Sequence, residues 1–93
     1  MKSTATIHET HPSIVKRLRR AEGHLHRVIT MFGEGRSCVD LAQQLYAVER
    51  AIAQAKKELI RDYVDHCLET VASGKFGQES GVVSEFKAIC RYL

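Results

Sequence analysis

Apolar side chains recur at steps of three and four residues along most of the chain, which is the period of an α-helix. The first such stretch should begin near Pro12, whose fixed φ suits the first helical position, and end at Phe32 before Gly33 and Gly35. Its predicted buried stripe is Ile14, Leu18, Ala21, Leu25, Val28 and Phe32. Gly23 interrupts this helix at a cost of about 1 kcal/mol relative to alanine, which we interpret as room for close contact with another helix.

The longest periodic stretch runs from Ser37 to about Ala72 and contains neither proline nor glycine. Ser37 followed by Asp40 resembles a capping box with the shorter acid, and so predicts where a second helix starts. The predicted seam of this helix has the spacing of helices that cross at a shallow angle: Leu41, Leu45, Val48, Ile52, Ala55 and Leu59. Small side chains in its middle would let two such helices approach closely: Ala47, Ala51, Ala53 and Ala55.

A third, shorter helix is predicted beyond Gly74 and Gly77 from a final apolar group: Val82, Val83, Phe86, Ile89, Cys90 and Leu93. We expect this helix to pack across a dimer. Residues 1–11 carry no apolar period and are interpreted as a flexible arm, which leaves 12–93 as a single all-helical domain. The predicted fold class is therefore all-α. Because 93 residues bury only a modest share of their surface, we expect oligomerisation to add to the core.

Two of the three cysteines lie near opposite ends of the second predicted helix. The 29 helical steps from Cys38 to Cys67 hold their sulfurs roughly 44 Å apart along the axis, so they cannot meet within one chain. If two copies pack antiparallel, centred near Ile52 and Ala53, Cys38 of one copy lies opposite Cys67 of the other. The spacing thus predicts a thiol site that exists only in the dimer.

The surroundings of these cysteines indicate their chemistry. No apolar run reaches the roughly 18 residues that span a bilayer, and no secretory signal is recognisable, so we expect a cytoplasmic protein with no membrane partner and with reduced thiols. Tyr63 and His66 precede Cys67 by four residues and one residue. Soft thiolates with imidazoles nearby select Cu(I), Zn(II), Ni(II) or Co(II), or react as redox thiols. No metal is expected to be needed for folding.

The remaining histidines and the third cysteine have weaker interpretations. His8 and His11 would add nitrogen ligands if the arm folds back, and are otherwise solvated. His24 and His26 stand within a basic segment, where a phosphate contact or plain exposure is favoured over metal ligation. Cys90 is embedded in an apolar segment and is interpreted as structural.

The formal net charge of +3 is mild but unevenly placed. The first helix carries a basic cluster opposed only by Glu22: Lys16, Arg17, Arg19, Arg20 and Arg27. The second helix adds Arg50, Lys56, Lys57 and Arg61. Together these residues predict a positive strip on an oligomer that binds nucleic acid through its phosphates, and a merely solvated basic face is the alternative; no standard DNA-reading motif is present. Catalysis is not expected, because no phosphate loop, metalloprotease or nucleophile-elbow motif occurs.

Three segments resemble the CsoR/RcnR family of small all-helical repressors: Arg17 to His24, Cys38 to Asp40 with Gln43 and Gln44, and Asp62 to Cys67. The resemblance covers nearly the whole chain from Pro12 to Leu93. It implies an antiparallel dimer that assembles into a tetramer, binds operator DNA without effector, and releases it when an effector occupies a site shared between subunits. It also implies that Cys38 and Cys67 are effector ligands and that Arg17 and Lys57 contact DNA.

Tyr63 departs from that family pattern, because copper, nickel and formaldehyde sensors usually carry histidine there. A phenol with an ordinary pKa near 10 is a poor ligand for soft metals. Family members that sense persulfides keep both cysteines and lack the histidine. The effector is therefore interpreted as a metal ion first, with His66, His8 and His11 supplying nitrogens, and as a persulfide second.

Two further classes stay open at this stage. One is a metal-binding helical bundle without a DNA role, and the other is a structural helical protein whose cysteines are dispensable. A salt-dependent affinity for duplex DNA would separate the repressor from both.

Overall fold

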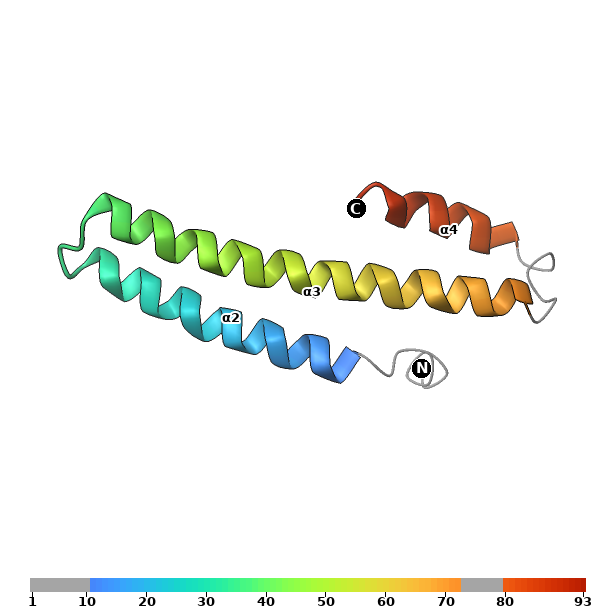
Figure 1. Cartoon of the computed structure of the whole chain (residues 1–93), viewed down its shortest axis with the longest axis horizontal. Coiled ribbons are helices and arrows are strands. Elements are labelled where there is room, and N and C mark those ends of the chain that lie inside the picture. The colour runs from blue at the N-terminus through green and yellow to red at the C-terminus, as the bar shows by residue number, and fades with distance from the viewer. Residues whose placement is uncertain (1–10, 73–79) are drawn as a thin grey trace. The chain divides into compact units, whose positions relative to one another are not determined.

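The computed structural model describes residues 11–72 and 80–93, and within these residues the chain contains three helices and no strand. They are α2 (His11–Phe32), α3 (Cys38–Ala72) and α4 (Ser80–Cys90) (Figure 1). The all-α class and the three predicted helices are thereby confirmed, and α2 begins at His11, next to the predicted start near Pro12. The predicted stop at Gly74 and Gly77 lies outside the described residues. The chain divides into two compact units within α3, one of which is His11–Lys56.

The unit His11–Lys56 is a helical hairpin. The turn after α2 contains Gly35 at a φ of 73°, a left-handed conformation that glycine adopts without steric cost. Ser37 then caps α3, because the Asp40 N–H donates to the Ser37 Oγ at 3.1 Å. The reverse half of the predicted capping box does not form, since the Asp40 carboxylate accepts a hydrogen bond from Arg36 at 2.7 Å instead.

Two rows of apolar residues run along this hairpin, and each row repeats every seven positions. The protomer buries one row, at the contact between α2 and α3: Ile14, Ala21 and Val28 on α2, with Val48 and Ala55 on α3. The second row stays between 40% and 46% exposed: Leu18 and Leu25 on α2, with Leu45 and Ile52 on α3. The predicted stripe and seam were therefore half right, because each merges a buried row with an exposed one.

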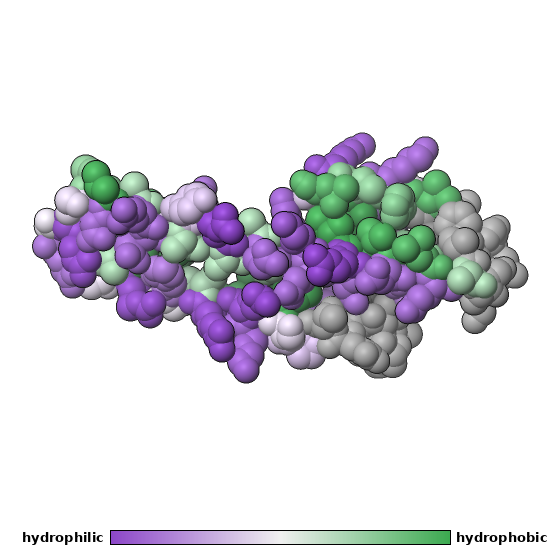
Figure 2. All heavy atoms as spheres, viewed as in Figure 1, coloured by the Kyte–Doolittle hydropathy of each residue, from purple (hydrophilic) through white to green (hydrophobic). Residues whose placement is uncertain are grey.

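The second unit includes the end of α3, from Lys57 onwards, and α4. Ile60 and Cys67 are buried on α3. Apolar side chains also gather over α4 (Figure 2), where Val83 and Phe86 remain about two-fifths exposed. Cys90, predicted to be structural, is a half-buried free thiol at the end of α4. None of the helices in the described ranges is long and apolar enough to cross a membrane.

Candidate effector site and nucleic-acid interface

Both candidate effector cysteines lie on α3 and are free thiols. Cys38 is the first residue of the helix and is exposed, whereas Cys67 is near its other end and is only 7% exposed. Within residues 11–72 and 80–93, no group of three or more His, Cys, Asp or Glu side chains could hold a metal ion. In the described part of one protomer, Cys38 and Cys67 are therefore free thiols outside any such group.

Tyr63 stands one helical turn before Cys67 and is half-buried. Burial raises the pKa of Tyr63 well above its ordinary value of 10, and hydrogen bonds and charge interactions with Cys67 and Glu85 raise it further. The phenol consequently remains protonated at neutral pH and serves as a neutral hydrogen-bonding neighbour of the thiol. The Cys67 half-site thus fits a soft ion through its sulfur, and Tyr63 does not fit as a ligand.

The histidines predicted as extra ligands occupy different places. His66 is half-buried beside Cys67, but consecutive helical residues point about 100° apart, so its ring is not directed along the Cys67 side chain. The His66 carbonyl accepts a hydrogen bond from the Thr70 hydroxyl at 3.0 Å. His11 is the first residue of α2, in the hairpin unit. His8 lies outside the described residues.

The basic residues of α2 separate onto different sides of the helix. A hollow of about 220 Å³ is lined by a hydroxyl and three cations: Ser13, Lys16, Arg17 and Arg20. This spacing of three, four and seven residues places them on one helical face. Arg19, predicted in the same group, instead lines a different cavity together with Glu22. Ser13 was missed from the sequence, although its position relative to the cations would have indicated it.

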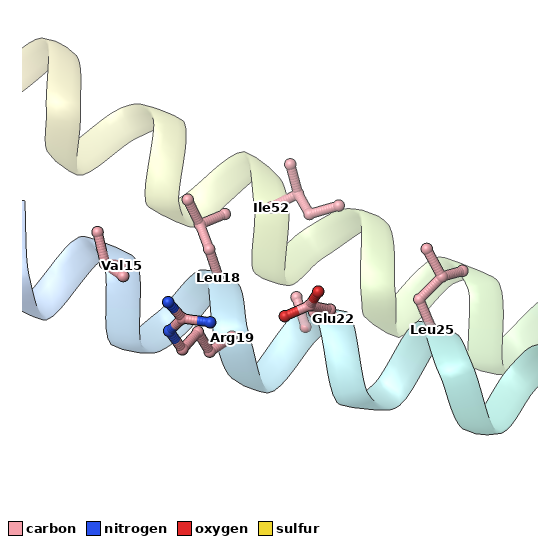
Figure 3. Close-up of a pocket in the computed structure, with 7 residues that line it drawn as sticks. Val15, Leu18, Arg19, Glu22, Leu25 and Ile52 are labelled. Atoms are coloured by element: carbon pink, nitrogen blue, oxygen red, sulfur yellow. The ribbon is translucent and has the colours of Figure 1, made fainter.

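That second cavity is an apolar groove of about 450 Å³ along the hairpin (Figure 3). Its lining takes most residues from α2 and Ile52 from α3: Val15, Leu18, Arg19, Ala21, Glu22, Leu25 and Ile52. Arg19 and Glu22 are its only charged members. The groove therefore coincides with part of the exposed apolar row.

Other predicted DNA contacts come from α3. Arg50 is exposed and lies over the ring of Tyr46, with its guanidinium carbon 5.8 Å from the ring centroid and a 3.4 Å hydrogen bond to the hydroxyl. Lys57 and Arg61 are exposed residues of the other unit. By contrast, Arg36 is held by Asp40 at 2.7 Å and Glu34 at 3.4 Å, and the hydrogen bond and charge of Asp40 raise the pKa of Arg36. Arg36 is thus a locally neutralised cation.

His24 has a structural partner that its sequence position did not predict. Its Nε2 lies 2.7 Å from the Gln44 Oε1, so the imidazole N–H donates across the hairpin from α2 to α3. This hydrogen bond is part-buried and spans 20 residues of sequence. His24 therefore helps to fix α2, and with it the basic hollow, against α3.

Comparison with known proteins gives one family and several relatives. Residues 10–91 match the family described as metal-sensitive transcriptional repressor. The chain is 32% identical over 79 residues to the copper-sensing transcriptional repressor RicR of Mycobacterium tuberculosis, covering 84% of this chain and 82% of RicR. It is 30% identical over 67 residues to the copper-sensing transcriptional repressor CsoR of Bacillus subtilis, covering 72% of this chain and 66% of that protein.

The coverage is smaller for the CsoR protein of Mycobacterium tuberculosis, which is 27% identical over 64 residues. These residues are 69% of this chain and 54% of that protein, so the chain spans about half of that relative. No solved structure is similar enough to the chain to count as a match.

Proposed function

Because the chain belongs to the metal-sensitive transcriptional repressor family, we propose that it releases operator DNA when an effector joins Cys38 of one subunit to Cys67 of another. Membership of this family confirms the predicted resemblance and the prediction that the protein is not an enzyme. It also implies binding to operator DNA. The cytoplasm is the compartment in which such a repressor would work.

The observation that carries this proposal is the incompleteness of the effector site in one protomer. Each end of α3 offers a single free thiol, and the described residues of one chain assemble no metal-binding cluster. An antiparallel second copy, centred between Ile52 and Ala53, would place Cys38 opposite Cys67 twice in each dimer. The exposed apolar row of the hairpin supports such a partner, because exposed rows of large apolar residues mark interfaces. A tetramer would add a second such dimer.

A metal ion is the first effector that we propose, and copper is the metal named for the relatives. Cu(I) is a soft Lewis acid that two thiolates can hold without a third ligand. In this arrangement Cys38 and Cys67 supply the sulfurs, and Tyr63 stays protonated beside Cys67. Ni(II), Co(II) or Zn(II) would need nitrogen donors as well, for which His66, His8 and His11 are the candidates.

A persulfide is the second candidate, and the state of Tyr63 is the observation that favours it. With a protonated phenol at position 63, the proposed site offers the thiols of Cys38 and Cys67 and no third ligand from Tyr63. An organic persulfide would transfer its outer sulfur to one cysteine, forming a cysteine persulfide, and leave as a thiol. The thiolate of the other cysteine would then attack the inner sulfur of this persulfide, form a disulfide and expel hydrogen sulfide. If a second organic persulfide first modifies the other cysteine in the same way, attack of one cysteine persulfide on the inner sulfur of the other forms a trisulfide and again expels hydrogen sulfide. Both effectors would therefore tie the same two α3 helices together.

DNA binding is assigned chiefly to the hollow formed by Ser13, Lys16, Arg17 and Arg20. Its three cations would neutralise backbone phosphates, and the release of counterions would supply much of the affinity. Arg50, Lys57 and Arg61 would extend the positive surface from α3. Joining Cys38 to Cys67 of the partner would alter how the subunits pack and so disfavour the arrangement that fits DNA. A coupling free energy of about 1 to 3 kcal/mol is usual for such linkage.

Mass spectrometry combined with DNA release tests the effector. The protein would be exposed separately to Cu(I), Ni(II) and an organic persulfide, and release would be followed with labelled DNA from upstream of its own gene. A stoichiometric metal adduct that accompanies release supports the metal sensor. A covalent link between two subunits, formed as a disulfide or with added sulfur atoms, supports the persulfide sensor when it accompanies release. Release that is unchanged in Cys38→Ala would contradict the proposed site for both.

A further inference from the structure

The hydrogen bond between His24 and Gln44 lies between the proposed effector thiol and the proposed DNA-binding hollow of the unit His11–Lys56. Gln44 follows Cys38 by six residues on α3, which is about 9 Å along the helix axis. His24 follows Arg20 by four residues on α2, on the helical face that carries the hollow. This 2.7 Å contact therefore links the end of α3 that begins with the thiol to the face of α2 that carries the cations.

We propose that this hydrogen bond transmits the state of the effector site to the DNA-binding hollow. Without effector, the bond holds α2 and α3 in the arrangement that fits DNA. When the effector joins Cys38 to another subunit, the start of α3 is displaced against α2, the bond is broken, and the hollow leaves that arrangement. This inference rests on the proposed function and deepens it by naming the contact through which the effector acts within each subunit. His24 and Gln44 are thus positioning residues.

The hydrogen bond responds to a small displacement more sharply than the apolar contact beside it. Apolar burial is non-directional, so Val28 and Val48 stay buried when the helices slide by a small distance. The Nε2–Oε1 distance is 2.7 Å, and an increase of about 1 Å is enough to break the bond. Helix shifts of about 1 to 2 Å are common in switching proteins. The contact thus has a formed state and a broken state, which a coupling element requires.

The surroundings of the bond restrict the two side chains. His24 and Gln44 are half-buried, and the buried residues Val28 and Val48 stand one helical turn after each of them. Because packed side chains have few alternative rotamers, a shift of α3 changes the distance between them instead of being absorbed by rotation. Partial exclusion of water also strengthens the bond and makes an unpaired Gln44 oxygen costly.

Polar contacts nearer to the start of α3 have a different reach. Arg36 pairs with Asp40 at 2.7 Å and with Glu34 at 3.4 Å, and these three residues lie within the turn and the first turn of α3. They move together when α3 moves, so they do not pass a shift of α3 on to α2. The contact between His24 and Gln44 instead spans 20 residues and joins the two helices.

Removal of each partner tests this role. His24→Ala and Gln44→Ala should each weaken DNA binding without effector by about fivefold, the usual contribution of one hydrogen bond. DNA binding with effector should stay unchanged, because the bond is already broken there. The double variant H24A/Q44A should match either single variant, since all three lack the same bond. His24→Gln keeps an N–H donor of similar reach and should behave like the original chain.

Fluorescence anisotropy with labelled DNA from upstream of the gene gives the affinities. The effector is whichever of Cu(I) and an organic persulfide releases DNA from the original chain. Gln43→Ala is the matched control, because Gln43 is the exposed neighbour of Gln44 and its loss should change neither affinity. Circular dichroism of each variant verifies that the helices have formed.

The outcomes separate this role from a merely structural one. Equal weakening of DNA binding with and without effector in His24→Ala and Gln44→Ala would overturn the inference and leave the proposed function intact. Unchanged DNA binding in both variants would overturn it as well. An original chain that neither Cu(I) nor the persulfide releases from DNA would instead overturn the proposed function, and this inference with it.

Discussion

At the scale of single residues, Tyr63 is the neighbour of Cys67 that bears most on the proposed choice of effector. Its raised pKa keeps the phenol protonated, so it cannot donate a lone pair as readily as a neutral imidazole does. Glu85 of α4 contributes to this shift. The protonation of the phenol next to the Cys67 thiol therefore depends partly on a residue from another helix.

The first prediction concerns Tyr63→His. The imidazole should tighten Cu(I) binding by about tenfold, because it adds a nitrogen ligand one helical turn from Cys67. Tyr63→Phe is the matched control and should leave the affinity unchanged, since the phenol is not a ligand. Competition with a chromogenic Cu(I) chelator measures both variants. A large loss of affinity in Tyr63→Phe would show that the phenol binds the ion after all.

The second prediction concerns the ionisation of Tyr63. The ultraviolet absorbance of phenolate, taken as the difference between the original chain and Tyr63→Phe, should appear only well above pH 10. The pKa of Tyr63 is higher in the folded chain than in the unfolded chain, so its protonated phenol stabilises the fold fully at neutral pH. This stabilisation is lost as the pH rises through the folded-state pKa of Tyr63. A difference signal that titrates near pH 10 would contradict the packing described for Tyr63, Cys67 and Glu85.

At the scale of helices, two glycines of the hairpin have opposite roles. Gly35 has a φ of 73°, which a side chain rarely adopts, whereas a Cβ on Gly23 would meet nothing within 4 Å. The described part of the protomer therefore does not supply the close helix contact predicted at Gly23.

The third prediction follows from this contrast. Gly23→Ala should raise the free energy of unfolding by about 1 kcal/mol through helix propensity, and Gly35→Ala should lower it by about 1 to 2 kcal/mol. Thermal unfolding followed by circular dichroism measures both changes. If Gly23→Ala lowers the melting temperature, another subunit fills the space at this position.

The helices themselves could be predicted from the sequence, because the apolar period, Pro12 and the Ser37 cap are local signals. The sequence did not show which apolar row the protomer buries. The rows that contain Ala21 and Leu18 repeat at the same spacing, and only the packing of α2 against α3 distinguishes them. The separation of Arg19 from Arg20 follows from helical geometry once the groove is known. The interaction of Glu85 with Tyr63 could not be predicted from the sequence, because it depends on how α4 packs.

At the scale of the whole molecule, one short chain has to provide a core, a sensor and a DNA surface. The hairpin buries one apolar row and leaves the other between 40% and 46% exposed. The groove and the basic hollow are lined by different residues of α2, so a substitution in the hollow leaves the lining of the groove unchanged. This division makes the DNA surface testable apart from the assembly.

The fourth prediction addresses that surface. Arg17→Ala and Arg20→Ala should each weaken operator binding, and the slope of log K against log salt should become shallower by about 0.9 for every phosphate that the variant no longer neutralises. Arg36→Ala is the control, because Asp40 and Glu34 already neutralise that cation. Fluorescence anisotropy at several salt concentrations gives the slopes. Unchanged slopes for Arg17 and Arg20 would place the DNA surface elsewhere.

The central claim is that the sensor thiols come from opposite ends of two different subunits. Its most direct test mixes Cys38→Ala with Cys67→Ala, both in a Cys90→Ala background, and oxidises the mixture with diamide. Only the mixed dimer contains a facing Cys38 and Cys67, so a covalent dimer should form in the mixture and in neither variant alone. A covalent dimer from a single variant, or none from the mixture, would contradict the account.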